Sequence, residues 1–251
     1  MSQTQKQSLY GLTLSELQTL CAELSLPRFA AKQIARWLYV RRVKAIEEMT
    51  DLSKAARAAL EEHYELGLAA PLKESCSADG TKKYLFRTSQ GEYIESAYIP
   101  DGDRATLCVS SQAGCRMGCR FCATGRQGLQ HSLSPNEILN QILSIPESKK
   151  LTNLVFMGMG EPLDNTDNVL QTLDIITSSW GLGWSPTRIT LSTAGVGRNL
   201  KRFLDESKVH LAISLHNPFH EEREQIMPIE RAYPIREVAD ILREYDFTHQ
   251  R

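Results

Sequence analysis

The chain has no excess of charge of either sign. Its 251 residues include 29 Lys and Arg and 30 Asp and Glu, which gives a formal net charge of −1. This balance excludes a globally basic protein that coats nucleic acid, because such binding depends on many cations facing phosphates. The chain also lacks an apolar run of the roughly 20 residues needed to span a bilayer. We therefore expect no transmembrane helix and no membrane partner.

An apolar signal segment is also missing from the N-terminus, which begins Met-Ser-Gln-Thr-Gln-Lys. Secreted precursors carry such a segment, so we expect a cytoplasmic protein. The six cysteines are bunched rather than spread, which argues against a framework of structural disulfides. The length and the 41% share of hydrophobic residues fit one large globular domain, with or without a small appendage.

Three of the cysteines lie close together in the chain. Cys115, Cys119 and Cys122 form a CxxxCxxC pattern within the glycine-containing segment Gly114–Gly125. Soft thiolates select iron–sulfur clusters or zinc over hard cations. A 4Fe–4S cluster is normally held by four cysteines, so three neighbouring cysteines predict a cluster with one iron open to another ligand. Glycine tolerates positive φ and lets the backbone wrap closely around such a group.

Zinc is the alternative metal that these cysteines could bind. A structural zinc site takes four protein ligands, and His131 is the candidate for the fourth. The chain would then be a non-catalytic zinc module that binds RNA. Analysis of iron and acid-labile sulfide after anaerobic reconstitution separates the two possibilities.

Three units are expected along the chain. Residues 1–70 predict a small helical domain, in which the capping box Thr13–Glu16 opens the first helix. Residues 71–103 alternate polar and apolar side chains between turn signals and predict a β connector. Residues 104–251 alternate strands with helices, which predicts a parallel sheet with right-handed crossovers. The expected fold class is α/β, a partial (β/α) barrel that carries a helical N-terminal domain and a β connector.

Four strands are predicted in the last unit, at 106–109, 153–157, 188–191 and 209–214. A polar or glycine-rich loop follows each strand, so all four loops are expected at the carboxyl edge of the sheet, where barrel enzymes build their sites. These loops are the cysteine segment, Gly158–Pro162, Ser192–Gly195 and Ser214–Pro218. Four β/α units leave a bare sheet edge, so we expect further strands beyond Arg251.

A local basic cluster lies in the N-terminal unit. Between residues 28 and 44 there is no acid, and two aromatic residues, Trp37 and Tyr39, are interleaved with the cations. Clusters of this kind suit phosphate backbones, although a solvated helix face is the alternative. The basic residues are Arg28, Lys32, Arg36, Arg41, Arg42 and Lys44.

With these loops in view, the chain resembles the radical S-adenosylmethionine (SAM) adenine carbon-2 methyltransferases that modify 23S ribosomal RNA and tRNA. The resemblance rests on the cysteine segment, on Arg104–Gln112 before it, and on the Gly158–Pro162 and Ser192–Gly195 loops. It extends over essentially the whole chain, including the basic helical N-terminal unit.

The resemblance assigns roles to residues at matching positions. It implies that Cys115, Cys119 and Cys122 ligate a 4Fe–4S cluster whose fourth iron takes SAM. It implies Glu95 as a proton acceptor and Cys108 as a resolving cysteine. A surface carboxylate is the alternative for Glu95, and a structural role is the alternative for His216. The residues implied to contact SAM are Gly160, Glu161, Ser192, Ser214, Leu215 and His216.

The chemistry implied by the resemblance uses two SAM molecules. One methylates a cysteine thiolate, and the other is cleaved to a 5′-deoxyadenosyl radical that takes hydrogen from the S-methyl group. The carbon radical attacks adenine, and Cys108 resolves the enzyme–RNA crosslink by forming a disulfide. The cofactors are thus a 4Fe–4S cluster and SAM. The implied partners are 23S rRNA, tRNA and an electron donor such as flavodoxin, and we expect a monomer.

The methyl-carrying cysteine of the family lies beyond Arg251. Cys21 and Cys76 fall in the N-terminal helices and the connector, so they do not replace it, and we expect the chain as written not to complete methylation. The sister activity at adenine carbon 8 uses the same residues and stays open. A radical SAM activating enzyme acting on a protein glycine needs neither Cys108 nor a basic appendage. Tyr93 and Tyr98 are expected to pack rather than to stack on bases.

Overall fold

A computed structural model describes residues 6–248 and Gln250. The first five residues of the expected 1–70 unit, and residues 249 and 251 of the last unit, lie outside the described residues. The main feature is a seven-stranded mixed sheet in the order β11-β10-β9-β6-β5-β4-β3. The α/β class is confirmed. The strands are β3 (Lys73–Cys76), β4 (Lys82–Arg87), β5 (Tyr93–Asp101), β6 (Arg104–Cys108), β9 (Asn153–Phe156), β10 (Ile189–Thr193) and β11 (His210–Ile213).

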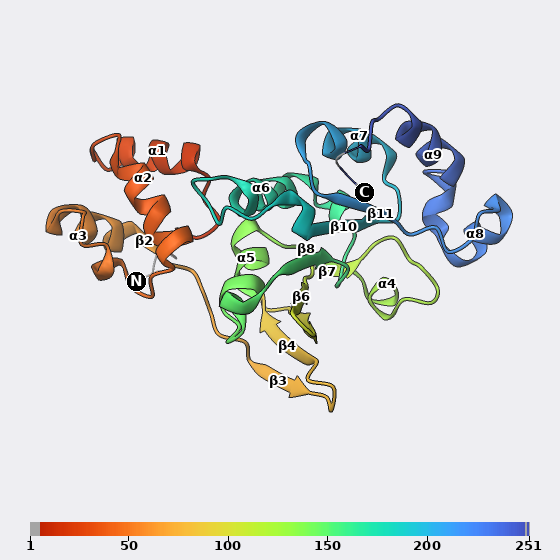
Figure 1. Ribbon diagram of the computed structural model, residues 1–251, viewed down its shortest axis with the longest axis horizontal. Helices are drawn as coiled ribbons and strands as arrows, with labels where there is room; N and C mark the ends of the chain where they lie inside the picture. Colours follow the sequence, from red (N-terminus) through yellow and green to blue (C-terminus); the bar gives the residue numbers. More distant parts are fainter. Residues whose placement is uncertain (1–5, 249, 251) are drawn as a thin grey trace.

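The four parallel strands are those predicted for the core, β6, β9, β10 and β11. Helices connect them and cover one face of the sheet (Figure 1). On that face Leu107, Leu154 and Leu191 are fully buried, so the apolar half of each strand packs against the helical layer. The helices are α5 (Pro135–Leu143), α6 (Thr166–Thr177), α7 (Gly197–Glu206) and α9 (Ile235–Arg243).

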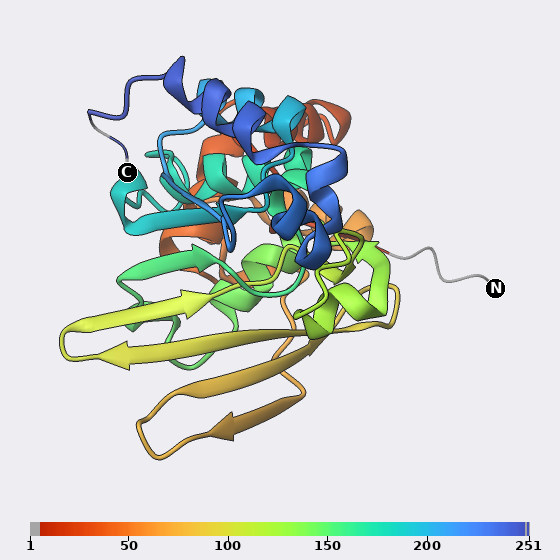
Figure 2. The same cartoon turned by 90° about the vertical axis from the view of Figure 1, so that its right-hand side faces the viewer.

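The strands expected as a connector continue the same sheet. β3, β4 and β5 form an antiparallel meander, and β5 pairs with β6 so that Ala97 lies opposite Cys108. Figure 2 shows these strands, yellow to gold, extending below the helices. Turn signals identify the hairpins in the sequence, whereas the partner of β5 depends on long-range packing that no local pattern reports.

The N-terminal unit is helical, as predicted. Its first helix, α1 (Leu14–Glu23), has the expected capping box, in which Glu16 N donates to Thr13 Oγ1 at 3.2 Å. Tyr39 packs edge-on against Trp180, at 5.8 Å between ring centroids, which joins this unit to the core. The remaining elements are α2 (Ala30–Ala35), the π-helical turn η1 (Arg36–Arg41), η2 (Ile46–Glu48), α3 (Lys54–His63), and the paired strands β1 (Gln7–Ser8) and β2 (Tyr64–Glu65).

Several short elements are not evident in the sequence. Most important is the hairpin of β7 (Gln112–Cys115) and β8 (Gly128–Ser132), which encloses α4 (Ala123–Gln127). After β11 come α8 (His220–Ile226) and the 3-10 turn η6 (Pro228–Arg231). Each has few residues, so hydrophobic periodicity carries little signal. Further 3-10 turns are η3 (Ser148–Lys150), η4 (Pro162–Asp164) and η5 (Pro186–Arg188).

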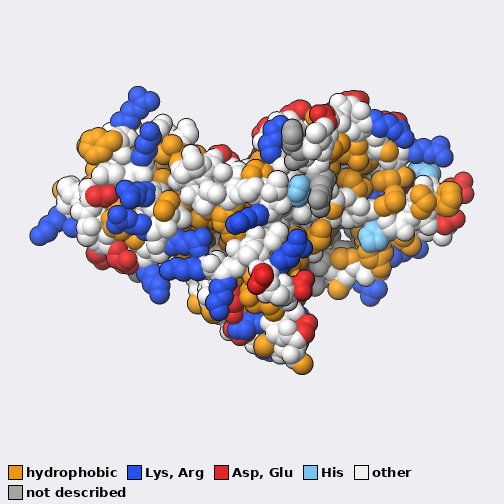
Figure 3. Space-filling model, viewed as in Figure 1, with side chains coloured by type: hydrophobic (Ala, Val, Ile, Leu, Met, Phe, Trp, Pro, Cys, Tyr) orange, Lys and Arg blue, Asp and Glu red, His pale blue; other side chains and the backbone are white. Residues whose placement is uncertain are grey.

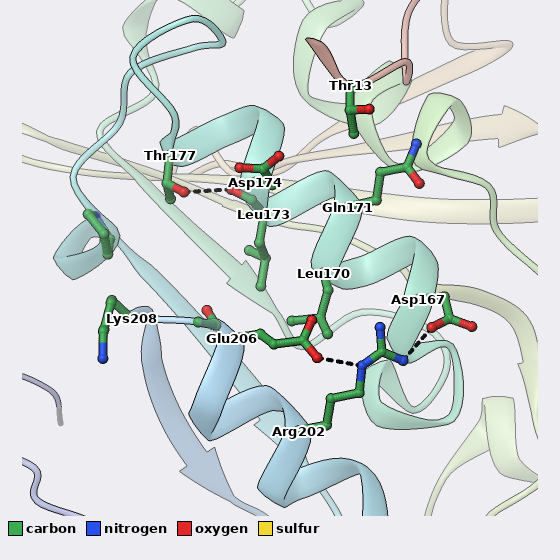
Figure 4. A pocket seen from close by; sticks show the side chains of 12 residues that line it. Thr13, Asp167, Leu170, Gln171, Leu173, Asp174, Thr177, Arg202, Glu206 and Lys208 are labelled. Atoms are coloured by element: carbon green, nitrogen blue, oxygen red, sulfur yellow. Dashed lines mark hydrogen bonds and ion pairs between the residues drawn. The ribbon is translucent and has the colours of Figure 1, made fainter. Parts of the chain in front are cut away.

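A groove of about 600 Å³ lies between α6 and α7 (Figure 4). Arg202 bridges Asp167 and Glu206 across it. No cysteine and none of the candidate site residues lines this groove. Among residues 6–248 and 250, no helix is long and apolar enough to cross a membrane.

Candidate functional site

The face of the sheet opposite the helices presents the candidate residues. Cys108 lies beside Val155, and Val155 lies beside Thr190 in the parallel register. Side chains alternate along a strand, so Ser192, two residues after Thr190, points to the same side as Cys108. Glu95 shares this side because it lies two residues from Ala97, the partner of Cys108. One open sheet face therefore carries Glu95, Cys108 and Ser192.

Glu95 and Cys108 differ in their surroundings. The Glu95 side chain is 45% exposed, and its carboxylate is 3.0 Å from Lys83 Nζ. Cys108 is half-buried at the end of β6. Burial raises the pKa of its thiol, against an opposing hydrogen bond from the Met157 backbone. The two residues thus lie on adjacent strands, one accessible to solvent and one partly shielded.

The cysteine segment is a closed hairpin. Cys115 pairs with Gly128 across β7 and β8, and the loop between them carries Cys119 and Cys122. Gly114 has φ of 74°, and a Cβ there would lie 1.8 Å from the Gly128 carbonyl oxygen, so only glycine fits. Cys122 caps α4 by accepting from Gly125 N at 3.4 Å. Backbone hydrogen bonds therefore hold Cys115 in the hairpin, and Cys122 lies at the start of α4.

The donor set fits an iron–sulfur cluster. Burial, joined by the nearby Glu161, Cys119 and Cys122, raises the pKa of Cys115 to about 11, although a backbone hydrogen bond from Met117 opposes this. The three thiols belong to one hairpin, and cationic iron would stabilise their ionised forms. All six cysteines are free, so none of them forms the disulfide implied for turnover.

The zinc alternative lacks its fourth ligand. His131 Nε2 is 3.0 Å from Glu137 Oε2, which ties the ring to the start of α5. Within the described part of the chain, no three His, Cys, Asp or Glu side chains converge closely enough to hold one metal ion. A cluster is larger than a single ion and does not require its thiolates to converge on one point.

The Gly158–Pro162 loop is pressed against the cysteine hairpin. Gly160 has φ of 98°, and a Cβ there would lie 2.6 Å from Gln112 Cβ. Glu161 N donates to Gln112 Oε1 at 2.9 Å, and Gln112 Nε2 donates to Asp164 Oδ2 at 2.9 Å. Fully buried Gln112 therefore joins β7 to the loop after β9. The sequence gives no signal for this role beyond the position of Gln112 in the segment Arg104–Gln112.

The Glu161 carboxylate is almost fully buried, with 4% of the residue exposed. It accepts hydrogen bonds from Thr193 Oγ1 at 2.5 Å, Ala194 N at 2.8 Å and Leu163 N at 3.1 Å. Burial raises the pKa of Glu161, and these donors oppose that effect. A carboxylate has about four acceptor sites, and these three donors occupy three of them; contact with SAM stays a prediction. Glu161 also ties the loop after β9 to the loop after β10.

The ends of β10 and β11 complete the site. Ser192 Oγ and Ser214 Oγ are 3.4 Å apart. Leu215 is exposed, and His216 adopts φ of 53°, which is unusual for a residue with a side chain. The His216 ring lies 4.5 Å from that of Phe121 in the cysteine loop. The structure thus brings the last predicted loop against the cysteines, and the SAM contacts of all these residues stay a prediction.

A buried arginine supports these loops, and the sequence analysis did not identify it. Arg223 of α8 is 0% exposed and forms an ion pair with buried Glu230. Its guanidinium also donates to three backbone carbonyls at 2.9–3.0 Å, one after β10 and two after β11. These carbonyls belong to Ala194, Ser214 and Leu215. Arg223 therefore fixes the backbone on which the predicted SAM contacts lie.

The basic cluster of the N-terminal unit differs from expectation in its aromatics. Trp37 and Tyr39 are buried, so neither is available to a base. Arg42 is partly buried and donates to Ser148 Oγ at 3.1 Å. The other cations are exposed, and Figure 3 shows Lys and Arg side chains over this lobe. The exposed members are Arg28, Lys32, Arg36, Arg41 and Lys44. The expectation that Tyr93 packs inside is wrong, because Tyr93 is 54% exposed.

Comparisons with known proteins agree with this geometry. Residues 109–249 match the radical SAM superfamily, and residues 7–66 match the ribosomal RNA large subunit methyltransferase N-terminal domain. The chain is 56% identical over 246 residues to the probable dual-specificity RNA methyltransferase RlmN of Bacteroides fragilis, covering 98% of this chain and 72% of that protein. It is 43% identical to the dual-specificity RNA methyltransferase RlmN of Syntrophotalea carbinolica, covering 98% of this chain and 66% of that protein.

A solved structure is also similar. The crystal structure of a radical SAM methyltransferase from Sphaerobacter thermophilus matches with a TM-score of 0.87 and 38% identity, over 95% of this chain and 72% of that one. The two matched domains cover both the helical N-terminal lobe and the core that carries the cysteine hairpin. The chain therefore belongs to the RlmN family of RNA methyltransferases within the radical SAM superfamily.

Proposed function

We propose that the protein takes part in methylating carbon 2 of adenine in 23S rRNA and tRNA, with a 4Fe–4S cluster and SAM as cofactors. The observation that carries this proposal is the open sheet face, where Glu95, Cys108 and Ser192 point to one side while the cysteine hairpin closes over the same strand ends. When bound, the cluster and SAM would supply the radical chemistry that an unactivated adenine carbon requires.

The chain's own residues would position and protect these groups. Cys115, Cys119 and Cys122 would hold the cluster. The Glu161 carboxylate and the hydroxyls of Ser192 and Ser214 would receive polar groups of SAM.

Two residues of the open face would act on the RNA adduct. Glu95 has an exposed carboxylate that can accept a proton, and it forms an ion pair with Lys83. Cys108 is half-buried on the same face of the sheet, opposite Ala97 of β5. We propose it as the group that releases the product.

The relatives' names support a proposal for the setting of the reaction. Because they are RNA methyltransferases, we propose that the protein works in the cytoplasm on folded RNA, as a monomer. We propose a flavodoxin-like electron donor, since reductive cleavage of SAM consumes one electron.

The test is cofactor chemistry followed by product analysis. Anaerobically reconstituted and reduced protein should convert SAM to 5′-deoxyadenosine and methionine, whereas protein treated with an iron chelator should not. For protein that also carries the family's methyl-carrying cysteine, digested RNA would then be examined for 2-methyladenosine and 8-methyladenosine by mass spectrometry. A product methylated at carbon 8 would replace the proposal with the sister activity. Absence of 5′-deoxyadenosine from fully reconstituted protein would contradict it altogether.

A further inference from the structure

A second hollow adjoins the open sheet face. It has a volume of about 910 Å³ and lies between the β4–β5 turn and the cysteine hairpin. One wall carries Arg87, Gln90 and Tyr93, and the other carries Gln127 at the end of α4 and Gln130 in β8. We call this hollow the turn groove. The segment that carries the three cysteines therefore forms one of its walls.

Tyr93 links the turn groove to the site. It lies opposite Arg87 in the β4–β5 register and two residues before Glu95. Tyr93, Glu95 and Ala97 therefore point to one side of β5, and Ala97 is the partner of Cys108. At about 3.4 Å per residue, Tyr93 lies roughly 14 Å along the strand from this pair. An RNA strand covers that distance with a few nucleotides at most.

Five polar side chains that line the turn groove have no partners in the fold. Within the described residues, no hydrogen bond or ion pair engages the side chains of Arg87, Gln90, Tyr93, Gln127 or Gln130. Glu92 also lines the groove but differs from these five, because its carboxylate accepts a hydrogen bond from Thr88 Oγ1. An exposed aromatic ring therefore lies beside an unpaired guanidinium and three free amides. This is a set of groups suited to a ligand.

These groups suit one class of ligand. The flat face of a tyrosine stacks on any nucleobase, a guanidinium binds phosphate through two parallel hydrogen bonds, and amides read the edges of unpaired bases. An enzyme that modifies a base must take it out of the helix, so nucleotides beside the target are also unstacked. Exposed Arg120 and Arg126 of the cysteine loop add positive charge near the same wall.

We propose that the turn groove binds an unpaired nucleotide that flanks the target adenosine in the RNA, with its base on Tyr93 and its phosphate on Arg87. This inference rests on the proposed function, since it takes the substrate to be RNA. It adds a subsite that determines where the strand lies relative to Cys108. Paired RNA does not fit, because both faces of its bases are already covered by their neighbours.

The test measures RNA affinity for reconstituted protein by fluorescence anisotropy. The probe is a labelled RNA hairpin with an adenosine-containing single-stranded loop. Tyr93→Ala should weaken binding by about 5- to 100-fold, since stacking of one base is lost. Tyr93→Phe keeps the ring and should bind like wild type. Arg87→Gln should weaken binding and reduce the slope of log affinity against log salt by roughly 1, the effect of one phosphate contact.

Ile99→Ala is the matched control. Ile99 lies on the same strand, points to the same side and is exposed, but it lies outside the turn groove. It should bind the hairpin as wild type does. A second probe with the loop paired to a complementary strand should bind weakly and show no difference between Tyr93→Ala and wild type.

The inference is overturned if Tyr93→Ala binds as tightly as Ile99→Ala, if Tyr93→Phe is as weak as Tyr93→Ala, or if wild type does not bind the single-stranded loop. Circular dichroism of each variant checks that the fold is kept. The formation of 5′-deoxyadenosine by wild-type protein without RNA separates the two proposals. If that reaction occurs and Tyr93 does not affect binding, only the turn groove assignment fails.

Discussion

Replacement of Arg223 by Met is the most informative perturbation of the site. The guanidinium is fully buried and joins Glu230 to the carbonyls of Ala194, Ser214 and Leu215. Met keeps much of the side-chain volume and removes every donor. The variant therefore tests the ion pair and the carbonyl contacts with little change in packing.

The expected loss of stability depends on how well the buried Glu230 carboxylate is compensated once the guanidinium is gone. Removal of one partner of a buried ion pair destabilises a protein by about 3–5 kcal/mol. Glu230 retains a hydrogen bond from His220 Nδ1 at 2.8 Å and contacts from Ile235 N at 3.0–3.1 Å. These partners partly compensate its charge, so we expect a loss near the lower limit, about 3 kcal/mol. The double variant Arg223→Met with Glu230→Gln should be less destabilised than the sum of the single variants.

Urea unfolding at pH 7 measures the loss, and equilibrium dialysis measures SAM affinity in reconstituted protein. SAM affinity should fall in Arg223→Met while iron content stays near that of wild type, because the cysteine hairpin has its own hydrogen bonds. The SAM affinity and unfolding free energy of Arg223→Lys should lie between those of wild type and Arg223→Met, since an ammonium keeps the charge and loses the planar fork. A loss of unfolding free energy below about 1 kcal/mol, with unchanged SAM affinity, would show that Arg223 does not hold these loops.

Two further predictions concern other parts of the molecule. Cys119→Ala should lose the cluster, measured as iron and sulfide per chain after reconstitution, whereas Cys21→Ala, in the core of the N-terminal unit, should keep it; a full complement of iron in Cys119→Ala would refute the ligand assignment. Backbone donors at Ser89 and Ser134, together with His131, hold the pKa of Glu137 below its usual value of 4.5, although burial opposes them. A lowered folded-state pKa contributes stability that is present above pH 4.5 and is lost as pH falls. The unfolding free energy, measured as pH is lowered through this range, should therefore decrease less steeply for Glu137→Gln than for wild type. Equal slopes for the two proteins would contradict this.

Local signals in the sequence predicted local structure well. The capping box predicted at Thr13 is present, and the helix that it opens begins at the next residue. The strand predicted at 153–157 is β9 (Asn153–Phe156), one residue shorter. These elements were predictable because their caps and alternation are encoded within a few neighbouring residues.

Features that depend on distant contacts were not predictable in this way. Arg223 looks like one more cation in an acidic helix, and its burial depends on Glu230 and on carbonyls from two other loops. Trp37 and Tyr39 lie among cations in the sequence, whereas the π-helical turn η1 directs both rings into the core. The pattern showed which residue types are present, and only the tertiary packing decides which of them face solvent.

The closed hairpin around the cysteines has a consequence for cofactor repair. Backbone hydrogen bonds between β7 and β8 join Cys115 to Gly128. The entropic cost of closing the loop is therefore offset by the folding of the hairpin and not by iron binding. In a zinc finger, by contrast, the metal and the fold come and go together. This protein should keep its fold when oxygen destroys the cluster, and a new cluster should be inserted into a preformed loop. Repair of the cluster then requires new iron and sulfide, and the chain does not have to refold or be replaced.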